Sequence, residues 1–270
     1  MAIFDIFEEV SEKSVTKSET GDNRILGVVV GEVVKNYSEQ MPGRVCVSIH
    51  VRDKDANVLK WARVSQPSSG EKWGMYFLPE IGDQVLLVFD QGIIDRPYVI
   101  GCIPKDKHEF LRKAKDEHNT HKKITTRHGS TILFEDVSEG DGEKDVIRIH
   151  TPDQAHEVTL DNDKKKITIQ DKEKKTQIEM ASEKGNITVK AEGKLTLKAG
   201  DNITVVMNGT NGKITVNCSD LTVQSTGKLI LDGGGKAQLS GASVKVESQA
   251  SLSLSAPGMA TLSGKPVRLG

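Results

Sequence analysis

The sequence predicts an all-β protein with two parts: an N-terminal OB-type barrel, and an intertwined triple-stranded β-helix, or β-prism, formed by a homotrimer. Three observations lead to this prediction. Strand-like segments separated by Gly- and Pro-containing loops crowd residues 24–103. Short apolar–polar–apolar triplets recur about every eight residues from residue 167 onward. All aromatic residues lie at or before Phe134, so the chain has two compositional regimes.

The composition argues against several classes of protein. Lys+Arg number 37 and Asp+Glu 38, and this balance disfavours a protein that coats nucleic acid. The longest apolar stretches fall far short of the ~20 residues that a membrane-spanning helix needs. Cys46, Cys102 and Cys218 are widely spaced and form no CxxC motif, so they predict neither a disulfide framework nor a zinc site. The acidic N-terminus does not look like a signal peptide, and we expect synthesis in the cytoplasm.

Residues 1–23 precede the barrel and place apolar side chains at helical spacing. These residues are Ile3, Phe4, Phe7 and Val10, with acidic residues between them. They predict a short amphipathic segment that could order against a partner. A frayed terminus is the alternative.

Residues 24–103 predict the barrel, because five short strand signals alternate with turn residues. In one of them Val45, Val47, Ile49 and Val51 share a face. OB folds often bind single-stranded nucleic acid, but that function needs a basic track with stacking aromatics. This region has nine Lys/Arg and nine Asp/Glu. We therefore assign its loop and strand aromatics to core and loop packing: Trp61, Trp73, Tyr76 and Phe77.

Residues 104–128 are predicted to form a charged linker. Residues 129–166 are predicted to form a neck that leads into the repeats. Three histidines of the linker, His118, His121 and His128, lie near acidic residues, but their spacing matches no strong zinc pattern. We expect a solvated connector and no metal site there.

Residues 167–270 predict the β-prism. Each triplet, such as Leu195-Thr196-Leu197, has period two, so its apolar pair faces one side of a strand. A strand this short is stable only when neighbours stack on it. A single-chain solenoid generally needs a longer repeat, and a flexible tail would not keep aliphatic residues in register, so the pattern favours three intertwined chains. The predicted trimer core is Ile187, Val189, Leu195, Leu197, Ile203, Val205, Ile214, Val216, Leu221, Val223, Leu229, Leu231, Val244, Val246, Leu252 and Leu254.

Several segments resemble the spike proteins of contractile injection machines, namely the phage baseplate assembly protein V and the VgrG protein of type VI secretion. The matching pieces are GVVVGEVV, GRV at residues 43–45, WARV at residues 61–64 and, most specifically, GMYFLPEIGDQVLLVFDQGIIDRPYVIG. Residues 129–171 are similar to the neck of that family, where its β-helix begins. With the repeats, the resemblance covers nearly all of residues 24–270.

The resemblance implies a structural, membrane-puncturing spike at the tip of the tube of a contractile injection machine. It also implies a separate hub or baseplate protein, which residues 1–23 are expected to contact, and assembly into a particle that meets the target envelope on firing. A PAAR-like tip protein is expected to cap the last repeats through Met259, Leu262, Pro266, Val267 and Leu269.

No catalytic residue set stands out, so we expect no enzymatic activity, no cofactor, no metal and no nucleic-acid partner. The alternative function is an OB-containing binding module with a β-solenoid adhesin tail, which a monomeric state would favour. The sequence leaves open whether the machine is a phage tail, a tailocin, an extracellular injection system or a type VI-like apparatus.

Overall fold

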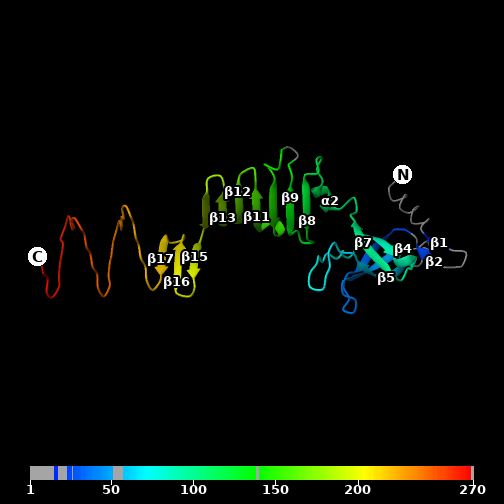
Figure 1. Ribbon diagram of the computed structural model, residues 1–270, viewed down its shortest axis with the longest axis horizontal. Coiled ribbons are helices and arrows are strands. Elements are labelled where there is room, and N and C mark those ends of the chain that lie inside the picture. Colours follow the sequence, from blue (N-terminus) through cyan, green and yellow to red (C-terminus); the bar gives the residue numbers. More distant parts are fainter. Residues whose placement is uncertain (1–14, 18–22, 26, 51–56, 138–139, 269–270) are drawn as a thin grey trace. The chain divides into compact units, whose positions relative to one another are not determined.

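The computed structural model describes the chain except residues 1–14, 18–22, 26, 51–56, 138–139 and 269–270. The regular secondary structure of the described residues is almost entirely β-strand, with one short α-helix and two 3₁₀ turns (Figure 1). The prediction of an all-β protein with an N-terminal barrel is confirmed. The short strands β1 (Val15–Lys17) and β2 (Asn23–Ile25) pair antiparallel ahead of the barrel.

Five strands close into a barrel in the order β3-β4-β5-β7-β6. Their bounds are β3 (Val29–Lys35), β4 (Arg44–His50), β5 (Asn57–Val64), β6 (Gln84–Phe89) and β7 (Pro97–Ile103). A short 3₁₀ turn, η1 (Asp90–Gly92), connects β6 to β7. The neighbours pair antiparallel except β5 and β7, whose short parallel contact closes the barrel. Closure leaves no long unpaired edge, and a five-stranded closed barrel is compatible with an OB domain.

Alternation along the strands fills the barrel core. Val45 and Val47 are 0% exposed and Ile49 is 1% exposed, as their period-two spacing predicts. Their neighbour Gly31 on β3 has no space for a side chain, because a Cβ there would lie 2.7 Å from Leu87 Cδ1. A glycine is therefore required where β3 crosses the packed core.

The aromatic residues of the β5–β6 loop do not lie in that core. Trp73 is 68% exposed and Tyr76 is 71% exposed. Backbone hydrogen bonds order the loop, since Gly70 N–H donates to Trp73 O at 2.7 Å and Met75 N–H donates to Ser68 O at 2.9 Å. The expectation that these rings pack in the core is therefore wrong for Trp73 and Tyr76. The expectation that they belong to an ordered loop agrees with the structure.

After the short helix α2 (Glu109–Ala114), seven antiparallel strands pair in sequence order as one sheet. Figure 1 shows the labelled members side by side. The strands are β8 (His121–Thr125), β9 (Thr131–Glu135), β10 (Val146–His150), β11 (His156–Asp161), β12 (Lys166–Asp171), β13 (Thr176–Ala181) and β14 (Asn186–Ala191), with η2 (Pro152–Gln154) between β10 and β11. The sheet thus begins inside the segment expected to be a linker and runs on past residue 167, where the prism was expected to start.

Carboxylates at strand ends hold the turns of this sheet. The Asp171 carboxylate accepts hydrogen bonds from Lys175 N–H at 3.1 Å and from the backbone and hydroxyl of Thr176. The Thr176 hydroxyl, together with the backbone donors, lowers the pKa of Asp171 to about 2. Burial alone would raise the pKa of Asp161, but the side-chain and backbone hydrogen bonds from Lys164 lower it on balance.

Pairing between strands of the same chain ends soon after this sheet. Strands β15 (Lys194–Ala199), β16 (Ile203–Asn208) and β17 (Lys213–Asn217) form a three-stranded sheet. Beyond Asn217, residues 218–268 contain no assigned strand, although the chain reverses direction repeatedly (Figure 1). This segment carries the later triplets, and its aliphatic side chains are exposed.

Candidate assembly surface

One face of the seven-stranded sheet carries an uninterrupted row of branched aliphatic side chains, which we call the apolar ladder. The register pairs each member directly with the next one across the neighbouring strand. From β8 to β14 the ladder is Ile124, Ile132, Ile149, Val158, Ile169, Ile178 and Val189. Cross-strand pairs of this kind stabilise the sheet, but they cover only the edges of each side chain.

A second row lies on the same face, two residues along each strand from the ladder. It begins at Lys122 and continues through Phe134, Ile147, Leu160, Ile167, Met180 and Ile187. The two rows together make one apolar face across the whole sheet. The opposite face is mostly polar and contains cross-strand ion pairs, for example Lys166–Glu179 at 2.8 Å.

The apolar face is the more exposed one, which reverses the usual arrangement of a sheet with one buried face. Ile169 is 48% exposed and Ile178 is 40% exposed, whereas Thr131 and Thr159 on the polar face are each 9% exposed. Completing the burial of a half-exposed aliphatic side chain contributes on the order of 1 kcal/mol. A contiguous apolar surface of this extent marks an interaction site.

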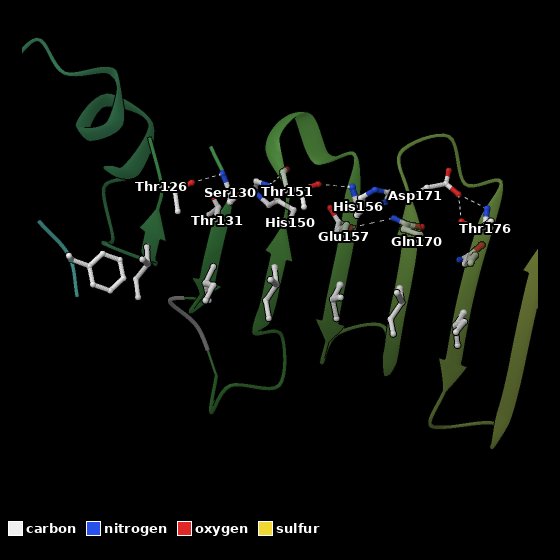
Figure 2. A pocket seen from close by; sticks show the side chains of 18 residues that line it. Thr126, Ser130, Thr131, His150, Thr151, His156, Glu157, Gln170, Asp171 and Thr176 are labelled. Atoms are coloured by element: carbon white, nitrogen blue, oxygen red, sulfur yellow. Dashed lines mark hydrogen bonds between the residues drawn. The ribbon is translucent and has the colours of Figure 1, made fainter. Parts of the chain in front are cut away.

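Polar side chains follow one margin of this surface. Figure 2 shows them at the strand ends, among them His150, Thr151, His156 and Glu157. They bond to one another or to the nearby backbone: His156 N–H donates to Thr151 Oγ1 at 3.0 Å, and Gln170 Nε2 donates to Glu157 Oε1 at 3.3 Å. An apolar centre with a satisfied polar margin is the usual anatomy of a protein interface.

The predicted trimer-core residues divide into two groups. Ile187 and Val189 continue the two apolar rows onto β14, and the residues from Leu195 to Val216 lie on β15–β17. The remaining members lie in residues 218–268, where Leu231 is 86% exposed and Leu254 is 88% exposed. All of these remaining side chains are exposed in the single chain, so their role in a trimer stays a prediction.

The terminal sites are only partly described. The hub-docking residues Ile3, Phe4, Phe7 and Val10 lie outside the described residues, as does Leu269. Met259 is 90% exposed and Leu262 is 72% exposed, and Pro266 and Val267 belong to the same unpaired segment.

The predicted trimer core begins at Ile187, so it leaves out the first six ladder residues, although Ile169 and Ile178 lie within the predicted β-prism. The other four, Ile124, Ile132, Ile149 and Val158, precede the prism. The signal was present, because Ile147-Arg148-Ile149 and Val158-Thr159-Leu160 are triplets of the same kind as those after residue 167. Their longer and less regular spacing separated them from the repeat.

No group of three or more His, Cys, Asp or Glu side chains in the described ranges converges as a metal site would require. His121 Nδ1 lies 3.7 Å from the Asp116 carboxylate, but Asp116 accepts mainly backbone hydrogen bonds. Across the part of the chain that the structure describes, no helix has the length and hydropathy to cross a membrane.

The barrel region is similar in sequence to known proteins. Residues 29–103 match the family model of the type VI secretion system/phage-baseplate injector OB domain. The chain is 37% identical over 79 residues to the type VI secretion system spike proteins VgrG1a and VgrG1b of Pseudomonas aeruginosa. That stretch is 28% of this chain, but only 12% of VgrG1a and 11% of VgrG1b. The family-model match is confined to the barrel, and it relates that part of the chain to VgrG and baseplate spike proteins.

Proposed function

We propose that this protein is the membrane-puncturing spike at the tip of the tube of a contractile injection machine. The observation that carries the proposal is the exposed apolar face of the β8–β14 sheet, which follows a barrel of the injector OB type. A rigid shaft behind a collar is what a puncturing spike requires. The role is mechanical, with no catalytic step, cofactor or nucleic acid.

The shaft is a homotrimer in this proposal. A second copy could cover the apolar ladder of the β8–β14 sheet by stacking face to face at about 10 Å. Residues 218–268 impose a stricter condition, because their strand-like triplets pair with no strand among the described residues of the same chain. Three chains that each supply one face per layer satisfy both segments and bury both sets of aliphatic residues around one axis.

Interchain pairing also suits the mechanical task. When every layer is held by three chains, local opening of one strand breaks contacts with two other chains, so the free energy of local unfolding is high. The spike would be synthesised in the cytoplasm, join the assembled particle, and pass into or through the target envelope when the machine fires.

Two partners complete the proposal. The N-terminal residues 1–23 bind a separate hub or baseplate protein, and a PAAR-like tip protein covers the segment that contains Met259, Leu262 and Val267. Deleting residues 2–12 should weaken hub binding and leave the trimer intact, and unchanged hub affinity would count against this contact. Truncation after Pro257 should abolish capture of the tip protein without unfolding the trimer.

The decisive experiment is the oligomeric state of the purified full chain, measured by analytical ultracentrifugation at micromolar concentration. We expect a trimer that persists in mild detergent. Leu229→Asp should prevent its formation, because an unpaired carboxylate inside the shaft is costly. The control Thr222→Asp changes the polar position of a neighbouring triplet and should assemble normally. A stable monomer would refute the spike and favour a binding module with an adhesin tail.

A further inference from the structure

Two arginines face each other on the outside of the barrel, where the register of β4 and β5 pairs Arg44 directly with Arg63. Like charges at directly opposite positions of an antiparallel pair destabilise it, typically by a few tenths of a kcal/mol to ~1 kcal/mol. The parallel contact that closes the barrel then sets Tyr98 beside Arg63. Packing does not call for this pair, since a single arginine or a neutral residue would avoid the repulsion.

Neither guanidinium has a carboxylate partner among the described residues. The two carboxylates that share their surroundings are already occupied: Asp90 pairs with Arg96 at 3.3 Å, and Asp95 pairs with Lys60. With respect to the described carboxylates, both arginines therefore retain hydrogen-bond donors.

The pair lies between two hollows in the barrel surface and contributes to both. One hollow is lined by the turn Gln40–Gly43 together with Arg44, Arg63 and Val64. The other hollow again includes Arg44 and Arg63, and its remaining lining residues are Trp61, Asp90, Asp95, Arg96, Pro97 and Tyr98. A ligand that spans the pair can thus place a group on each side of it.

Guanidinium groups suit carboxylates especially well, because their planar donors can bind both oxygens at once. Successive side chains on one face of an extended peptide are about 7 Å apart, which lets two of them enter neighbouring hollows. Net charge disfavours a nucleic acid, since residues 24–103 hold equal numbers of basic and acidic residues and form no continuous basic track.

We propose that Arg44 and Arg63 form a docking site for an acidic segment of a partner protein, which binds through its carboxylates in an extended conformation. The residues that line the site all belong to the barrel or its loops, and none belongs to the apolar face. Its affinity should fall steeply with added salt, because the contacts are charged and open to solvent.

The test uses the full chain and a fluorescent peptide of alternating Glu and Ser, with binding followed by anisotropy at low salt. Arg44→Gln and Arg63→Gln should each weaken binding about 10-fold, since each removes a charge-assisted hydrogen-bonding group. The double Arg→Lys variant keeps the charge but loses the planar fork, and should bind with intermediate affinity. The control Arg112→Gln removes an exposed arginine of α2 and should bind like the parent.

Folding can be checked separately, because loss of one of two facing like charges should leave the melting temperature equal or slightly higher. Unchanged peptide affinity in both single Gln variants would overturn the proposal. It would also be overturned if a thymidine oligonucleotide, inorganic phosphate or vesicles of anionic lipid bound more tightly than the peptide with the same dependence on Arg44 and Arg63.

Discussion

Ile178→Asp provides the sharpest test of whether the apolar face is covered in the functional state. Ile178 lies in the ladder between Ile169 and Val189 and is 40% exposed in the single chain. If the apolar face is open to solvent in the functional state, Ile178→Asp should lower the free energy of unfolding by only about 1 kcal/mol, because the isoleucine side chain is only partly buried. If other copies cover the face, every chain would have to bury a carboxylate, which costs several kcal/mol or forces its protonation.

Gln177→Asp is the matched control. Gln177 is the preceding residue on the same strand but faces the polar side, between Gln170 and Lys190. The Gln177→Asp substitution introduces the same charge next to Lys190, so its effect on folding and assembly should be small. The two variants therefore separate the effect of a charge from the effect of the face that carries it.

The assay combines sedimentation velocity with urea unfolding at several protein concentrations. We expect Gln177→Asp to remain assembled with a concentration-dependent unfolding midpoint, and Ile178→Asp to lose assembly or to regain it only at acidic pH. Equal assembly of the two variants at neutral pH would refute the reasoning that the apolar ladder is an interface.

Three further predictions concern local structure and can be checked by circular dichroism with chemical or thermal denaturation. Gly31→Ala should lower the free energy of unfolding by about 1–3 kcal/mol, because its Cβ would meet Leu87 Cδ1 at 2.7 Å inside the packed barrel; an unchanged midpoint would contradict the close approach. Lys174→Gly should raise the free energy of unfolding by roughly 0.5–1 kcal/mol, since residue 174 has φ 56° and only glycine adopts that conformation freely. A lower free energy of unfolding would show that the turn is not strained. The pKa of Asp171 in the folded protein is about 2, below the usual 3.8, so its ionised carboxylate should stabilise the sheet fully above pH ~4 and lose this effect as the pH falls toward 2. Asp171→Asn should remove that part of the acid dependence of stability. An identical acid profile in the variant would exclude the Thr176 hydrogen bonds as its cause.

The local features of this protein follow from the order of its amino acids alone. Period-two alternation identified the strand of Val45, Val47 and Ile49 and the shared face of these side chains, because side-chain direction in a strand depends only on position along the chain. It did not show that Cys46 and Ser48, on the other face of the strand, are buried as well. The same rule located the triplets and their apolar sides. The change in composition after Phe134 separated barrel from repeats, and the motifs around residues 61–101 indicated the spike family that the barrel matches.

The identity of neighbouring strands could be learned from the folded chain but not from the sequence pattern. Alternation tells which face a residue occupies but not which strand lies beside it, so the joining of Ile124, Ile149 and Ile178 into one ladder depended on hydrogen-bond register. The same limit applies to Arg44 and Arg63, which stand far apart in sequence and become a pair only through the β4–β5 register. Register depends on turn geometry and on the packing of the whole sheet. Alternation of apolar and polar residues gives no information about either.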